Sequence, residues 1–182
     1  MTMYLAGKVG GAKWDLWKGL GGVEHKTGHL HWKELGGLKV EASDGTNHSE
    51  HLWGGGLSLS AIGSTDLSKS VKAYALQPIR HCRFLLAYLD TPDSFGSIAE
   101  IAYATALGKQ CYVILLVPEQ KEEVSVEEGG HEHVIWPWEG MIDAYWFVSC
   151  FPGVKSVAVK SCEEAIDVAR GYILLGKRLP IQ

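Results

Sequence analysis

Residues 83–109 read Arg-Phe-Leu-Leu-Ala-Tyr-Leu-Asp-Thr-Pro-Asp-Ser-Phe-Gly-Ser-Ile-Ala-Glu-Ile-Ala-Tyr-Ala-Thr-Ala-Leu-Gly-Lys. The apolar run at 83–89 is typical of a strand that is buried on both faces of a parallel sheet. A short polar loop follows, and then residues 97–107 predict a helix that stops at Gly108. This order indicates an α/β fold, in which ligands bind beyond the carboxyl ends of the strands.

Outside this stretch, the pattern of apolar and capping residues predicts the rest of one domain. Further strands are expected at 2–6, 37–42, 110–117 and 144–149. One helix is expected at about 66–81, interrupted by Pro78, and another begins at the capping box Ser161-Cys-Glu-Glu164 and runs to about residue 175. The prediction is a single Rossmann-like, flavodoxin-like domain over residues 1–182, with a mainly parallel five-stranded sheet flanked by helices.

Two segments have no clear periodicity. Residues 10–63 are rich in Trp, Gly and His, and we expect them to form substrate loops, with a long loop at 43–56. Residues 119–133 are polar and acidic and predict a surface loop.

Composition limits the partners. A net charge of −4 and a pI of about 6.0 argue against a nucleic-acid polymer, which needs a basic face, but not against a single nucleotide. No apolar run has the length of a membrane span, and the start of the chain lacks the features of a secretory signal. The four cysteines form no C-x-x-C pair, which favours free thiols and a cytoplasmic location.

Glu100 is the leading candidate for a functional side chain. A helical wheel puts Ile98, Ile101 and Thr105 against the sheet and places Glu100 on the opposite side, in the first turn. One alternative is a capping box, Ser97-Ile-Ala-Glu100, in which the glutamate only bonds back to the helix start. The helix N-terminus would lower the pKa of Glu100 and keep it ionised.

The preceding loop strengthens the case for a ligand. Asp90, Asp93, Ser94 and Ser97 supply two carboxylates and two hydroxyls within a few residues. Such a group suits a polyhydroxylated ligand such as a sugar, whose hydroxyls need acceptors.

The segment 93–109 resembles the nucleoside 2-deoxyribosyltransferase family, including its deoxynucleoside-monophosphate N-glycosidase relatives. The shared pattern is a loop of small residues, Gly96-x-x-x-Glu100, a helix and Gly-Lys109 before a strand, and Tyr4-Leu-Ala-Gly7 matches the family's opening strand. The resemblance implies cleavage or transfer of the N-glycosidic bond of a 2′-deoxynucleoside or its 5′-monophosphate, through a covalent glycosyl-glutamate. It also implies a homo-oligomer and no cofactor.

Residue roles follow from the same resemblance. Glu100 falls at the nucleophile and Tyr4 at the tyrosine that orients it, while Asp90 or Asp93 binds the sugar or assists departure of the base. Ser94 and Ser97 would bind a 5′-phosphate, and the remaining ligand contacts are expected from Gly7, Lys8, Trp14 and Gly96.

This sequence departs from the family at two places. The helix before the central strand carries Gln77 where many members have an aspartate, and the Trp/Gly/His-rich segment replaces a compact N-terminal helix. An aromatic face there would stack on the base, and Trp14, Trp17, Trp32 and Trp53 all remain candidates.

Several other functions were weighed. The spaced histidines lie in three separate loops without paired cysteines, so no metal site is expected. No P-loop and no G-x-G-x-x-G fingerprint is present. Two alternatives stay open: a non-catalytic nucleotide-sensing module on the same fold, and a different nucleotide N-ribohydrolase, whose Pro-Gly-Gly-x-Gly-Thr loop is poorly matched by Pro92-Asp-Ser-Phe-Gly-Ser97.

Overall fold

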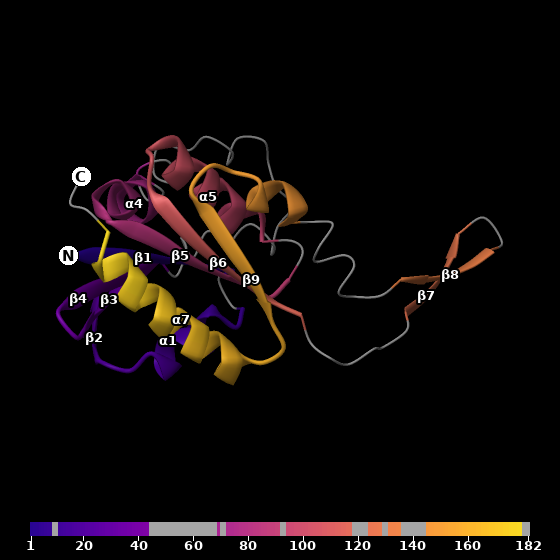
Figure 1. Ribbon diagram of the computed structural model, residues 1–182, viewed down its shortest axis with the longest axis horizontal. Helices are drawn as coiled ribbons and strands as arrows, with labels where there is room; N and C mark the ends of the chain where they lie inside the picture. Colours follow the sequence, from indigo (N-terminus) through magenta and orange to yellow (C-terminus); the bar gives the residue numbers. More distant parts are fainter. Residues whose placement is uncertain are drawn as a thin grey trace.

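The computed structural model describes residues 1–8, 11–43, 69, 72–91, 94–117, 124–128, 131–135 and 145–179. They form an α/β structure with a mostly parallel sheet between two layers of helices (Figure 1). The predicted α/β class is therefore confirmed. The predicted strand count is wrong, because the sheet has seven strands in the order β2-β3-β4-β1-β5-β6-β9.

The centre of the sheet is built from the apolar strands that the sequence predicts. They are β1 (Thr2–Ala6), β4 (Leu38–Ser43), β5 (Phe84–Leu89) and β6 (Gln110–Leu116). All six residues of β5 are buried, and β5 lies parallel to both β1 and β6. The continuous apolar run was thus a sound indicator of a strand covered on both faces.

The fifth parallel strand is not the expected one. Residues 145–149 are helical, with Tyr145 and Val148 buried at helical spacing while Trp146 and Phe147 stay exposed. The strand is instead β9 (Val154–Val159), which pairs parallel with β6 at the edge of the sheet. Only Val159 is fully buried in β9, so its apolar pattern was too weak to find.

The Trp/Gly/His-rich segment is more ordered than expected. Within it lie α1 (Lys13–Gly19) and the strands β2 (Val23–Thr27) and β3 (Leu30–Leu35). Strands β2, β3 and β4 pair antiparallel and extend the sheet beyond β1. The prediction of substrate loops within segment 10–63 is therefore wrong for 13–35, while the strand predicted at 37–42 is present as β4, and the predicted loop 43–56 lies almost wholly outside the described residues.

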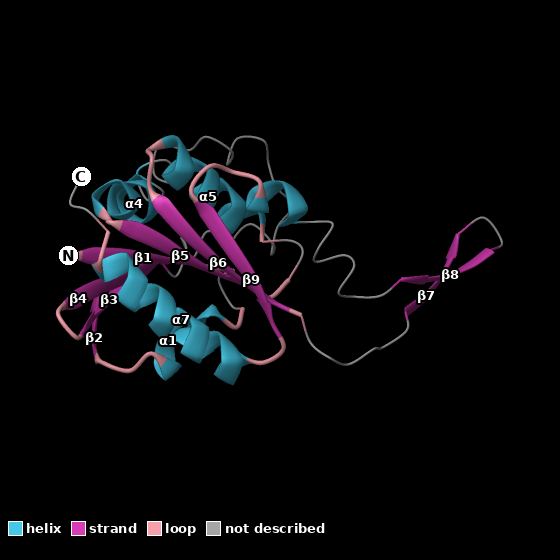
Figure 2. Ribbon diagram, viewed as in Figure 1, coloured by secondary structure: helices cyan, strands magenta, loops and turns pink. Residues whose placement is uncertain are grey.

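The two helix layers cover opposite faces of the sheet (Figure 2). Helices α1 and α7 (Cys162–Lys177) pack on one face, with Leu16, Trp17 and Ile173 in its core. On the other face lie α4 (Gln77–His81), α5 (Phe95–Ala106) and segment 145–149. Ser161 caps α7 by accepting a 3.2 Å bond from the amide of Glu164, which confirms that predicted cap.

The predicted helix at about 66–81 is described from residue 72 onward. A π-helical turn, Lys72–Leu76, leads directly into α4. Pro78 stands in the first turn of α4, the part of a helix where proline is tolerated. Within the segment predicted as a surface loop, β7 (Val124–Glu128) and β8 (His131–Ile135) pair as an antiparallel hairpin.

Candidate functional site

The carboxyl ends of β1 and β5 are the topological switch point of the sheet. After β1 the chain enters α1 on one face, and after β5 it enters α5 on the other. Open α/β sheets bind their ligands at such points. Most of the predicted site residues with described positions lie on the strands, loops and helices that meet here.

Glu100 lies farther along α5 than expected. Helix α5 begins at Phe95 with Ser94 as its N-cap, so no acidic residue lies in its first turn. The buried residues of α5 are Ser97, Ile101 and Ala104, and Glu100 belongs to the same side of the helix. The predicted helical wheel had the wrong phase, because it was centred on the apolar Ile98. The small residues of α5 are the ones that bring this helix close to the sheet.

Glu100 does not cap its own helix. Its Oε1 accepts a 2.7 Å hydrogen bond from the hydroxyl of Tyr4, which projects from the middle of β1. Ser97 lies inside the helix and cannot serve as its N-cap, so the capping alternative is wrong. The expected proximity of Tyr4 and Glu100 is confirmed.

The electrostatics of this pair differ from the expectation. Burial raises the pKa of Glu100 above its ordinary value, and Lys13 and the Tyr4 hydroxyl offset only part of that effect. Burial and the Glu100 carboxylate together raise the pKa of Tyr4 well above its ordinary value. The predicted lowering by a helix N-terminus is wrong, because Glu100 lies beyond the first turn, where the dipole acts.

Lys13 is a residue that the sequence analysis missed. It begins α1, only 2% of its surface is exposed, and its Nζ donates a 2.7 Å bond to the carbonyl of Ser43. The sequence feature that could have identified Lys13 is its spacing from Gly7. In a P-loop, the lysine follows the first glycine of the motif by six residues. Ala12 and Trp14 replace the glycine and the hydroxyl residue of that motif, so the pattern is incomplete.

Asp90 reaches back to the start of α1. Its Oδ2 accepts a 2.6 Å bond from the amide of Ala12, and Gly11 permits this because a Cβ there would stand 2.7 Å from that oxygen. The other oxygen, Oδ1, is buried and has no hydrogen-bond partner among the described residues. A buried oxygen without a donor costs roughly 1–3 kcal/mol, so Oδ1 is an unsatisfied acceptor at the switch point.

The other predicted residues have varied surroundings. A Cβ on Gly7 would lie 2.8 Å from both the Lys13 Cβ and the Tyr88 carbonyl, so Gly7 serves close packing of the β1–α1 corner. Ser94 Oγ bonds the carbonyl of Thr91 at 3.1 Å and Ser97 is buried, so neither hydroxyl is turned to solvent. Gly96 faces open space.

Two of the four tryptophan candidates are less suited to stack on a base. Trp17 is buried in the core, and Trp32 is stacked on His25 at a centroid distance of 4.0 Å. Trp14 is half-buried beside Lys13, whose Nζ lies 4.8 Å from the ring centroid. Lys8 is half-buried at the end of β1, whereas Asp93 and Trp53 lie outside the described residues.

The described residues provide neither a metal site nor a membrane-spanning helix. Among the described residues, no group of three or more His, Cys, Asp or Glu side chains is arranged to hold a metal ion. Across the same described ranges, no helix combines the length and the apolar character needed to cross a membrane.

Comparisons with known proteins support a different relationship from the predicted one. No family model and no curated protein matches the chain. A solved structure described as a probable GTP-binding protein engB matches over 98% of this chain and 99% of its own, with a TM-score of 0.56 and 9% identity. Translation elongation factor SelB from Methanococcus maripaludis, in complex with GppNHp, aligns over 35% of its own length and all of this chain, at 9% identity and a TM-score of 0.49.

These findings overturn the resemblance to the nucleoside 2-deoxyribosyltransferase family. The structural likeness is to a protein described as GTP-binding, and no deoxyribosyltransferase family model matches the chain. The resemblance also implied N-glycosidase and transferase activities, with Glu100 as a covalent nucleophile. These inferences depended on it and are wrong with it. At 9% identity, the likeness establishes the fold alone.

Proposed function

We propose that this chain is a nucleotide-binding module that does not cleave N-glycosidic bonds, and that its ligand lies at the carboxyl ends of β1 and β5. The observation that carries the proposal is the buried Oδ1 of Asp90, which lacks a partner among the described residues at the switch point. A ribose hydroxyl is the donor that this oxygen lacks, since a carboxylate can only accept.

The same corner offers a surface for the base. Trp14 follows Lys13 in the first turn of α1 and is half-buried, with its ring packed edge-on to Trp17 and 4.8 Å from the ring of His31. Stacking of a base on an aromatic ring contributes about 1–3 kcal/mol and tolerates any base. We therefore assign the ribose to Asp90 and the base to Trp14.

The phosphates would be held differently from those in a P-loop protein. The amide of Ala12 is already bonded to Asp90, and Lys13 already donates to Ser43. Trp14 stands where a P-loop has the hydroxyl that binds Mg²⁺. We accordingly expect nucleotide binding that is independent of Mg²⁺ and is not followed by hydrolysis.

Calorimetry with a set of nucleotides tests the proposal. GTP and GDP come first in the set, because the matching structure is described as a probable GTP-binding protein, followed by ATP, dGMP and guanosine. Asp90→Asn keeps the shape but weakens the acceptor, and we expect its affinity to fall about tenfold. Asp167→Asn is the matched control, since Asp167 is exposed on α7.

Two results would refute this proposal. One is the absence of binding by every member of the set at millimolar concentration. The other is equal affinity for wild type, Asp90→Asn and Asp167→Asn. In the same samples we expect no release of free base, and chromatography of the nucleotides after incubation measures this directly.

A further inference from the structure

A second feature lies at the opposite edge of the sheet. A cavity of about 750 Å³ opens at the amino ends of the parallel strands. Its lining residues come from the starts of β1, β5, β6 and β9 and from the ends of α4, α5 and α7: Met1, Thr2, His81, Cys82, Arg83, Thr105, Gly108, Lys109, Gln110, Pro152, Gly153 and Leu179. Small-molecule sites in proteins have volumes of roughly 300–1,000 Å³, so this cavity has a suitable size.

The described residues that line the cavity give it a positive charge. Arg83 and Lys109 contribute two cations, and no aspartate or glutamate is among the described residues that line the cavity. Among the described residues, neither cation forms an ion pair with a carboxylate. Anionic ligands would therefore be attracted to this cavity.

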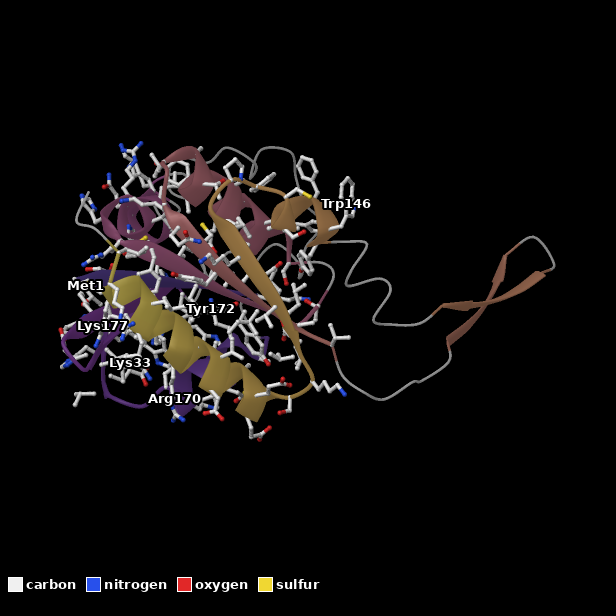
Figure 3. The ribbon with its side chains drawn as sticks, in the orientation of Figure 1. Met1, Lys33, Trp146, Arg170, Tyr172 and Lys177 are labelled. Carbon is white, nitrogen blue, oxygen red and sulfur yellow. The ribbon has the colours of Figure 1, made fainter. Side chains whose placement is uncertain are left out.

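Arg83 is the more informative of the two. Its Nε is buried without a hydrogen-bond partner among the described residues. Among the described residues, its Nη1 donates to the sulfur of Met1, at 3.1 Å, and a thioether is a weak acceptor. Met1 lies at the start of β1, beside the C-terminal end of α7 (Figure 3). Among the described residues, the guanidinium therefore has no oxygen acceptor, which is the kind of partner that forms its strongest hydrogen bonds.

The Lys109 side chain is not needed to satisfy the carbonyls of Ala104 and Thr105 at the end of α5. Basic residues often stabilise the last carbonyls of a helix. At the end of α5, however, the amide of Gly108 bonds Thr105 at 2.9 Å and that of Lys109 bonds Ala104 at 3.0 Å. Backbone groups therefore already satisfy these carbonyls.

The remaining walls are apolar or neutral. Pro152 and Leu179 contribute apolar surface. Burial raises the pKa of Cys82 to about 12, so this wall residue stays an uncharged thiol.

We propose that this cavity is a second binding site, independent of the proposed nucleotide site, for a small organic anion that joins a carboxylate or phosphate to an apolar body. The anionic group would bind the Arg83 guanidinium, with Lys109 beside it, and the apolar body would pack against Pro152 and Leu179. A guanidinium matches the two oxygens of such a group with paired hydrogen bonds.

The test uses 2-naphthoate as the anion and the uncharged 2-naphthamide as its control, each titrated into the ¹⁵N-labelled full chain. Naphthoate should shift the backbone amides of Thr2, Arg83, Gln110 and Gly153. Arg83→Gln should weaken naphthoate about tenfold, and 2-naphthamide should bind wild type about tenfold more weakly than naphthoate does. Lys18→Gln, on an exposed turn of α1, should have no effect.

Circular dichroism shows whether Arg83→Gln folds. If it does not, Lys109→Gln replaces it in the same test. The proposal is overturned by amide shifts that lie elsewhere, by no shift at about 10 mM naphthoate, or by equal affinities for naphthoate and naphthamide. Asp90→Asn distinguishes the two sites, because it should weaken nucleotides and leave naphthoate binding unchanged.

Discussion

The hydrogen bond between Tyr4 and Glu100 joins the centre of the sheet to α5. Tyr4 is 1% exposed, and its hydroxyl lies 2.7 Å from the Glu100 carboxylate. The sequence predicted that these two residues would meet, although from a family resemblance that proved wrong. The sequence did not predict which face of α5 lies against the sheet. That face carries the small residues Ser97 and Ala104, which give little hydrophobic signal.

Removing the Tyr4 hydroxyl should destabilise the fold. In Tyr4→Phe the Glu100 carboxylate loses a donor in a buried position, and we expect the free energy of unfolding to fall by about 1–3 kcal/mol. Urea denaturation at pH 7 measures the change. Tyr112→Phe is the control, because that ring is buried in the other core cluster and its hydroxyl forms no hydrogen bond with another described residue; its effect should stay below about 0.5 kcal/mol. Equal losses in both variants would contradict the role assigned to the Tyr4 bond.

The raised pKa of Glu100 predicts a dependence of stability on pH. An acid of this kind binds its proton more tightly in the folded chain, so its stabilising contribution is complete below the unfolded value near 4.5. That contribution is lost as the pH rises through the higher folded value. Because glutamine does not ionise, the stability of wild type relative to Glu100→Gln should decrease as the pH rises.

Glu163→Gln is a control for which the change of stability with pH should have the opposite direction. Hydrogen bonds from its own amide and from Ser161 lower the pKa of Glu163, whose contribution is present above 4.5 and is lost as the pH falls. Wild type should therefore gain stability relative to Glu163→Gln as the pH rises. Urea midpoints from about pH 3.5 to pH 8 measure both trends, and a Glu100 trend that rises with pH would disprove the assigned shift.

At the scale of elements, burial decided what the sequence could predict. Strands β5 and β6 were evident because their apolar runs reflect burial on both faces. Strand β9 and the hairpin β2–β3 lie at the edges of the sheet, and every residue of β2 is exposed. The apolar segment 145–149 matched a strand in composition, whereas its buried residues, three apart, follow the spacing of a helix.

Two glycines of α7 offer a matched test of how this helix packs. A Cβ on Gly176 would overlap the ring of Phe84 on β5, whereas a Cβ on Gly171 would meet nothing within 4 Å. Gly176→Ala should therefore destabilise the protein by roughly 1–3 kcal/mol, as overpacking does. Gly171→Ala should stabilise it by about 0.5–1 kcal/mol, because alanine favours a helix. Thermal unfolding of the two variants measures the difference, and the opposite order would show that α7 does not approach β5 as described.

At the scale of the whole molecule, the order of strands decides where a ligand would bind. The change of face between α1 and α5 brings Asp90 to the start of α1, a contact between residues 78 positions apart that no local pattern predicts. The site could therefore be predicted only in part. The carboxylates of the loop after β5 were recognised, but Lys13 and the bond from Asp90 to Ala12 depend on how distant segments meet.

The oligomeric state of the protein is still a prediction. The expected homo-oligomer was inferred from the family resemblance. Exposed aromatic side chains, among them Trp146 at 60% exposure, occur on the helical segment 145–149 (Figure 3). Analytical ultracentrifugation gives the molecular mass in solution, and a monomer at every concentration would refute the prediction.

The central claim is that a nucleotide binds at the carboxyl edge of the sheet, between β1 and β5. Titration of GTP into the ¹⁵N-labelled chain, followed by mapping of the amide shifts, tests it most directly. The claim predicts shifts at Gly7, Gly11, Ala12 and Thr91, around the Asp90 carboxylate, and a titration midpoint about tenfold higher in Asp90→Asn. Shifts confined to the amino-edge cavity around Arg83, or no shifts at millimolar GTP, would contradict it.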